Sequence, residues 1–65
     1  MILLSDKIVV EYRLGNFGYK LVKNDNNSYD LYYLSGDDEI EYGSYKTLHN
    51  ALESAKAITE IIRNP

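Results

Sequence analysis

Apolar and polar residues change their spacing once along the chain, from alternation to a repeat of three and four. The repeat occupies the last part of the chain, between Thr47 and Asn64. Spacing of this kind places apolar side chains on one side of a helix. The residues of this apolar stripe are Leu48, Ala51, Leu52, Ala55, Ile58 and Ile62. With Thr47 as the N-terminal cap and Asn64-Pro65 as the stop, the pattern predicts a helix over about residues 48–63.

The first part of the chain alternates with the period of a β-hairpin. Strands are predicted over about residues 7–14 and 17–23, and Gly15-Asn16 supplies a two-residue turn with glycine first, as a type II′ turn prefers. This turn fixes a register in which the large apolar side chains share one face. The pairs on that face are Leu14 with Phe17, Tyr12 with Tyr19, and Val10 with Leu21. The pairs on the other face are Glu11 with Lys20 and Val9 with Val22.

Two further strands are predicted over about residues 29–34 and 39–42. Polar, turn-forming residues precede each of them, at 24–28 and 35–38. If each strand pairs with its neighbour in sequence, the apolar residues of both strands join the same face. The expected pairs are Leu31 with Leu21, Tyr33 with Tyr19, Ile40 with Tyr33, and Tyr42 with Leu31. Gly43 is expected to break the fourth strand ahead of the helix cap.

These elements predict an α+β fold in a single domain over residues 1–65. The architecture is a four-stranded antiparallel meander sheet with one C-terminal helix packed on one face, a two-layer ββββα arrangement. The sheet residues expected in the core are Ile8, Val10, Tyr12, Leu14, Phe17, Tyr19, Leu21, Leu31, Tyr33, Ile40 and Tyr42. One helix covers only one face of a sheet, so the other face meets solvent or a partner.

Composition and charge narrow the setting in which such a domain works. The 65 residues include no cysteine, so neither a disulfide nor a thiolate metal site supports the fold. The stretch Met1–Ser5 is too short for the apolar part of a signal peptide, and no apolar run approaches the ~20 residues that span a bilayer. We therefore expect a soluble, cytoplasmic protein with no membrane contact. A net charge of −3 opposes binding to phosphate backbones.

Catalytic and metal-binding chemistry is poorly represented. His49 is the single histidine, and the chain lacks a nucleophile elbow, a phosphate-binding loop and a zincin motif. The acidic residues near the fourth strand are Asp37, Asp38, Glu39 and Glu41. Solvated charges that protect an edge strand explain them better than a cation site does. The loop at 24–30 lacks the central glycine and closing glutamate of a calcium loop. We expect no enzyme, no cofactor and no metal.

The outward face of the predicted sheet carries the candidate binding surface. Its apolar centre is Val9, Val22, Tyr32 and Leu34. Its charged rim is Glu11, Arg13, Lys20, Asp30, Glu39 and Glu41. An apolar centre with an aromatic residue and a charged rim is typical of protein-binding patches. The competing interpretation is that a thin two-layer domain always exposes some apolar side chains. We expect Tyr32 and Leu34 to be the anchors of a protein contact.

The predicted function is that of a small non-enzymatic interaction protein, an inhibitor or adaptor of phage or mobile-element type that binds a host protein of unknown identity. Homodimerisation through the same face, or through the first strand extended by Ile2, Leu3 and Leu4, satisfies the same pattern. A DNA-binding accessory domain would use Lys7, Arg13, Lys20 and Tyr32, but neighbouring acids cancel their field. An acidic DNA-mimic inhibitor is a further alternative.

Overall fold

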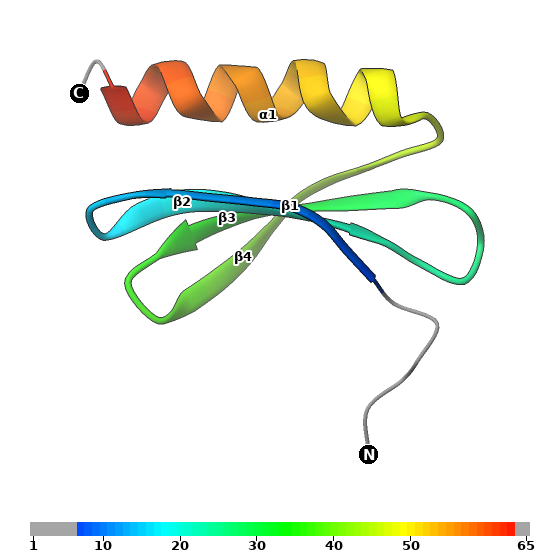
Figure 1. Ribbon diagram of the computed structural model, residues 1–65, viewed down its shortest axis with the longest axis horizontal. Coiled ribbons are helices and arrows are strands. Elements are labelled where there is room, and N and C mark those ends of the chain that lie inside the picture. Colours follow the sequence, from blue (N-terminus) through cyan, green and yellow to red (C-terminus); the bar gives the residue numbers. More distant parts are fainter. Residues whose placement is uncertain (1–6, 64–65) are drawn as a thin grey trace.

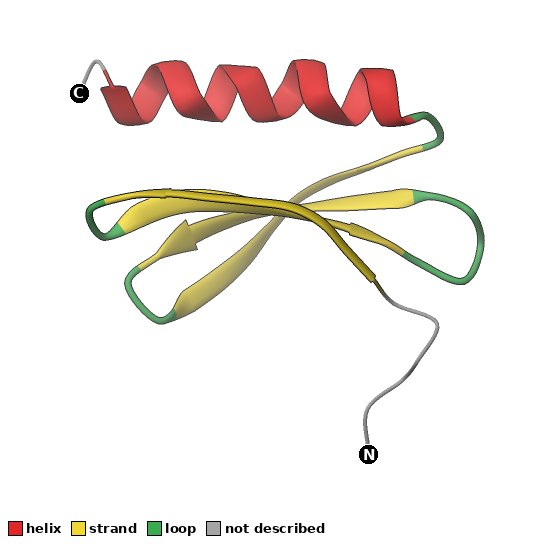
Figure 2. Cartoon of the chain, in the orientation of Figure 1, coloured by secondary structure: helices red, strands yellow, loops and turns green. Residues whose placement is uncertain are grey.

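The computed structural model describes residues 7–63 and forms one sheet with one helix on it (Figure 1). The elements in chain order are β1 (Lys7–Leu14), β2 (Phe17–Lys23), β3 (Tyr29–Ser35), β4 (Asp38–Tyr45) and α1 (Leu48–Arg63). All neighbouring strands are antiparallel, and their order in the sheet is β1-β2-β3-β4. The predicted ββββα fold is therefore confirmed (Figure 2). The expectations for Ile2–Leu4 and for Asn64-Pro65 lie outside the described residues.

The register of the first hairpin follows from its turn. Gly15 has a φ of 65°, in the left-handed region that suits glycine. Asn27 is the one described non-glycine residue with a positive φ, so the second turn residue, Asn16, does not have one. A positive φ at the first turn residue alone is the type II′ pattern. The three apolar pairs predicted between β1 and β2 are present, and so is the pairing of Glu11 with Lys20.

One predicted pair of this hairpin is wrong because β1 contains a bulge. The register shifts between Ile8 and Val10, so Ile8, rather than Val9, pairs with Val22. An extra residue in one strand sends every side chain beyond it to the opposite face. Ile8 therefore lies on the face away from the helix, where it is 61% exposed, and it does not join the core.

A second bulge changes the fourth strand. Tyr32 pairs with Glu41, but the next pair is Leu31 with Gly43, so Tyr42 is the extra residue. The predicted pairing of Tyr42 with Leu31 is wrong, and Gly43 does not break β4, which continues to Tyr45. A Cβ atom at position 43 would lie 2.7 Å from the Tyr45 hydroxyl oxygen. Glycine at this position thus leaves room for the Tyr45 ring, which packs against the core.

The helix begins where the sequence predicts. The backbone N–H of Asn50 donates to the Thr47 hydroxyl oxygen at 3.2 Å, which confirms the N-terminal cap. The helix contacts β2, β3 and β4. The fully buried residues of the resulting core are Leu21, Leu31, Ala51, Ala55 and Ile58. The core is narrow and lies under the middle of the helix, over the two central strands.

Several residues predicted for the core lie at its margins. Between 37% and 53% of the surface is exposed for each of Leu14, Phe17, Ile40, Tyr42, Leu48 and Leu52. The reason is width, since a helix with its side chains is about 10 Å across. Four strands spaced about 4.8 Å apart extend over roughly 14 Å between the outer strand axes. A single helix therefore leaves apolar side chains uncovered along the outer strands.

Candidate protein-binding surfaces

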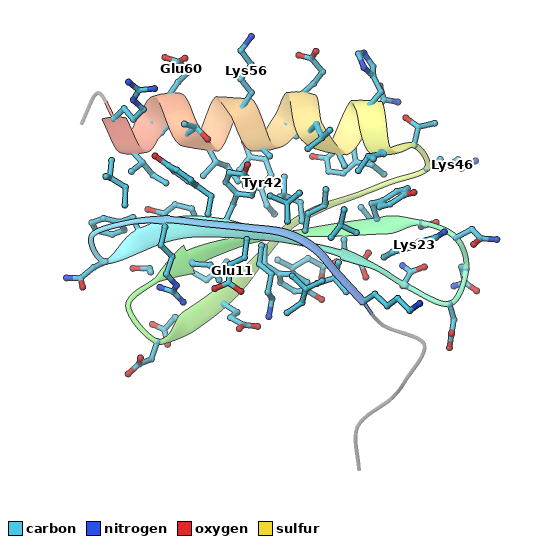
Figure 3. All side chains as sticks on the ribbon, viewed as in Figure 1. Glu11, Lys23, Tyr42, Lys46, Lys56 and Glu60 are labelled. Atoms are coloured by element: carbon cyan, nitrogen blue, oxygen red, sulfur yellow. The ribbon has the colours of Figure 1, made fainter. Side chains whose placement is uncertain are left out.

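The predicted binding surface lies on the open face, which we define as the sheet face away from α1. Figure 3 shows Glu11 on this side and Tyr42 on the other, between the helix and the sheet. Cross-strand pairing arranges the open face in three rows, each crossing the sheet from β1 to β4. The rows are Arg13-Gly18-Leu34-Glu39, Glu11-Lys20-Tyr32-Glu41 and Ile8-Val22-Asp30-Ser44. Of the predicted apolar centre, Val22, Tyr32 and Leu34 are brought together, and Ile8 takes the place expected for Val9, which lies in the β1 bulge and is 40% exposed.

Leu34 occupies an open-face position and is nevertheless 1% exposed. Its neighbour on β2 is Gly18, over which the Arg13 side chain lies so closely that a Cβ at Gly18 would come within 3.0 Å of the Arg13 Cγ. Arg13 then reaches the Gly36 carbonyl oxygen, to which its Nη1 donates at 3.2 Å. The aliphatic stem of Arg13 thus spans the position beside Leu34. The expectation that Leu34 is exposed is wrong, and Leu34 cannot anchor a partner.

The polar side chains of the open face already interact with one another. Lys20 Nζ lies 2.7 Å from a carboxylate oxygen of Glu39 and 5.5 Å from the centre of the Tyr32 ring. Asp30 accepts hydrogen bonds from the Ser44 hydroxyl at 2.9 Å and from the Asn24 amide at 3.2 Å. These contacts fix the side chains within the sheet. They also reduce the charge that the open face offers to a partner.

The open face holds a shallow polar depression of about 300 Å³. Its lining residues are Ile8, Lys20, Val22, Asp30, Tyr32 and Glu39. Half of the lining is charged, and its lysine is paired with its glutamate. The depression is therefore a weak binding site for an apolar group, because burial would cost the solvation of these charges.

Side chains capable of catalysis or metal binding are dispersed. His49 has an 81% exposed side chain, and its Nε2 lies 3.9 Å from Glu53 one helical turn later. Within residues 7–63, no group of three or more histidine, aspartate, glutamate or cysteine side chains is placed to hold a metal ion. The acidic residues Asp38, Glu39 and Glu41 lie on the edge strand β4, Asp37 lies in the turn before it, and all four are exposed.

A second surface, which the sequence analysis did not predict, lies between α1 and the edge strand β4. It is a groove of about 250 Å³ with an almost wholly apolar lining, and we call it the margin groove. Its lining residues are Tyr33, Ile40, Glu41, Tyr42, Ile58 and Ile61. Three of these side chains are about half exposed: Ile40 at 53%, Tyr42 at 48% and Ile61 at 59%. The groove is thus open to solvent at these three side chains.

The apolar surface continues from the margin groove toward the first hairpin. The ring of Phe17 stacks on the ring of Tyr33, with 6.3 Å between their centres. Phe17 is 45% exposed, and its partner Leu14 is 47% exposed. Large contiguous apolar patches are uncommon on monomeric proteins and mark interaction sites. The margin groove is therefore the strongest candidate for a binding surface.

Sequence reasoning missed Ile61 because it lies to one side of the helical stripe. Counting 100° per residue, Ile61 is displaced by about 100° from Ile62 and by about 60° from Ile58. The apolar stripe as defined from the sequence does not include Ile61, which then falls among the polar residues of the helix. An apolar residue at that angle on an otherwise polar flank is the feature that would have indicated a second contact surface.

Comparison of the chain with protein-family models, with curated proteins and with solved structures finds no match. The described helix is not long and apolar enough to cross a membrane. The open face and the margin groove are therefore the features of the described residues that bear on function.

Proposed function

We propose that this protein is a non-enzymatic interaction module that binds a protein partner through the margin groove. The observation that supports the proposal is the grouping of Ile40, Tyr42 and Ile61, each about half exposed, around one apolar groove. Burying the rest of their apolar surface against a partner is favourable by about 25 cal/mol per Å². Tyrosine is one of the residue types enriched in binding hot spots, and Tyr42 provides one in this groove.

The open face is the second candidate, because Ile8, Val22 and Tyr32 meet on it. Its support is weaker for two reasons. Leu34 is buried, and the charged rim is partly neutralised by the pairing of Lys20 with Glu39. Tyr32 is then the main aromatic group that this face offers to a partner.

Nucleic-acid binding through the sheet is a less favourable proposal. Glu39 lies 2.7 Å from Lys20, and Glu11 lies 3.6 Å from Arg13, so each of these cations has a carboxylate beside it. The chain as a whole carries a net charge of −3. Binding to phosphates depends on a positive field, which these pairs weaken. A role as an acidic mimic of DNA would need a larger negative charge than this.

We further propose a cytoplasmic setting and the role of an inhibitor or adaptor, of the kind that phages and mobile elements encode. The absence of cysteine from all 65 residues fits a reducing compartment. A domain of this size acts most simply by covering a surface of a larger protein. No membrane contact is part of the proposal.

The test is affinity capture from host lysate with matched surface variants, after nuclease treatment. Ile61→Gln and Ile40→Thr remove apolar surface from the margin groove at exposed positions, so the fold should survive, as circular dichroism would verify. Tyr32→Ala is the matched change on the open face. We expect a protein that the wild type retains to be lost with both groove variants and kept with Tyr32→Ala. Loss with Tyr32→Ala alone would move the binding surface to the open face. Capture that disappears with nuclease would favour the nucleic-acid alternative.

A further inference from the structure

The margin groove borders a free edge of the sheet. Strand β4 pairs with β3 on one side, and no other strand of residues 7–63 pairs with its second side. Edge strands present unpaired backbone N–H and C=O groups that another extended chain can use. The groove and the free edge are adjacent because Ile40 and Tyr42, which line the groove, belong to β4 itself.

We propose that the occupant of the margin groove is an extended segment of the partner, added beside β4 as a fifth strand, in which apolar residues alternate with lysine or arginine. This inference rests on the proposed function and specifies the chemistry of its partner. The apolar residues of the segment would lie in the groove, and the basic residues would lie on the open face.

The unpaired backbone groups at the edge of β4 favour a strand over a helix as the occupant of the groove. A partner helix lying in the groove would cover Ile40, Tyr42 and Ile61, but it would leave the backbone groups at the edge of β4 without partners. Shielding an unpaired backbone group from water costs about 1–3 kcal/mol, so that arrangement is penalised. An added strand satisfies the same groups. At a spacing of about 4.8 Å from β4, its inward side chains would pass beside Ile61.

The acidic side chains of β4 favour basic residues on the side of the segment that faces away from the groove. On the open face, the first two rows end on β4 with Glu39 and Glu41. Glu39 contacts Lys20, while both glutamates border the position that a fifth strand would occupy. Side chains directly across neighbouring strands interact, and opposite charges there are favourable. Lysine or arginine at alternate positions of the segment would meet this acidic pair.

The same charges argue against a second copy of this chain at the edge. If two β4 strands paired antiparallel with Ile40 facing Ile40, each Glu39 would face Glu41 of the other copy. Two like-charged pairs would result, between chains that each carry a net charge of −3. Bulges and charges on edge strands commonly prevent self-pairing, and β4 has both. A basic segment is attracted by the charges that repel another copy.

The experiment is an NMR titration of the full chain with two short peptides that differ only in charge. One alternates lysine with valine, and the other alternates glutamate with valine. We expect the lysine peptide to shift the amide signals of residues 38–42 and the methyl signals of Ile61. N-methylation of the peptide groups that face β4 should abolish these shifts. Shifts confined to the open face, retention of binding after N-methylation, or no binding of the lysine peptide would each overturn the inference.

A charge reversal gives the sharper control. Glu41→Lys should weaken binding of the lysine peptide by about two- to fivefold and strengthen binding of the glutamate peptide by a similar factor, so the preference for the lysine peptide falls. Glu53→Lys makes the same change in net charge on the exposed side of the helix and should leave the preference unchanged. An equal effect of both variants would show long-range attraction rather than strand pairing.

Sedimentation of the wild type as a dimer that Ile40→Thr dissociates would assign the groove to a second copy. Loss of lysate capture with the groove variants, without peptide binding, would leave the proposed function standing and reject the strand.

Discussion

The two faces of the sheet differ in which of their apolar side chains are buried. On the helix face, Leu21 and Leu31 are fully buried under α1, but Ile40 at the margin is half exposed. On the open face, no helix is present, and yet Leu34 is buried. Among the exposed large apolar side chains of the sheet, Ile8 lies on the open face, and the helix face carries Leu14, Phe17, Ile40 and Tyr42. How far an apolar side chain of the sheet is buried depends on the width of the helix packed over it and on where long polar side chains lie.

This contrast shows how a polar residue can complete a core. Arg13 is charged and belongs to an exposed strand, but its stem lies over Gly18 and its guanidinium reaches Gly36. Gly36 is held in turn by a hydrogen bond from its N–H to the Asn16 carbonyl at 2.6 Å. The turns at one end of the sheet are thus tied together above Leu34. Leu34 is thus buried on the face that has no helix, apart from the main core.

The largest expected effect is a loss of stability when a side chain of the central core is truncated, compared with one at the margin groove. Leu31→Ala removes a fully buried side chain and should lower the free energy of unfolding by about 2–5 kcal/mol. Ile40→Ala, at a half-exposed position of the neighbouring strand, should cost less than half as much. Urea denaturation of both variants would measure the difference. Equal losses would mean that the margin groove is filled in solution.

A somewhat smaller effect is expected on the open face. Leu34→Ala should lower the free energy of unfolding by about 2–3 kcal/mol, because its side chain is 1% exposed. Tyr32→Ala, in the adjacent row of the same strand, should cost less, because Tyr32 is partly exposed. Thermal melts followed by circular dichroism would rank the two. The reverse order would show that the open face has no core of its own.

A third effect concerns the cover over Leu34. Arg13→Ala removes the stem beside Leu34 and the hydrogen bond to Gly36, and should cost about 1 kcal/mol. Combined with Leu34→Ala, the two losses should not add, since one residue covers the other. A double-mutant cycle would measure the coupling. Additive losses would show that Arg13 acts independently of Leu34.

The smallest effect is expected at the ion pair of the open face. Lys20→Gln removes the contact with Glu39, whose carboxylate side chain is 49% exposed, and should lower the free energy of unfolding by about 1 kcal/mol or less. Repeating the urea titration at high salt should reduce the difference between the variant and the wild type. A salt-independent loss would instead indicate that packing of the lysine stem matters more than its charge.

Most of the fold could be predicted because alternation and turn chemistry agree. The pairing of Tyr12 with Tyr19 follows from the two-residue turn, and the cap at Thr47 follows from the residue type. The two bulges could not be predicted, since neither Val9 nor Tyr42 differs in type from an ordinary strand residue. The first bulge changed the candidate site by bringing Ile8 to the open face, and the second leaves Tyr42, which lines the groove, without a pairing partner on β3.

The candidate site was harder to predict than the fold for a related reason. The sequence shows which face a residue belongs to, but not how far a neighbouring side chain reaches across it. The burial of Leu34 depends on the conformation of Arg13, and the exposure of Ile40 depends on the width of α1. Both depend on how side chains and elements pack, which the spacing of apolar residues along the sequence does not show.

The order of the strands also has a consequence for how the chain folds. Every strand pairs with its neighbour in sequence, so both halves of the sheet assemble from short hairpins. Contacts between nearby residues form quickly, and topologies rich in them fold fast. Until α1 docks, however, Leu21 and Leu31 face water. The sheet should therefore form early and gain most of its stability in the last step, when the helix closes over these two residues.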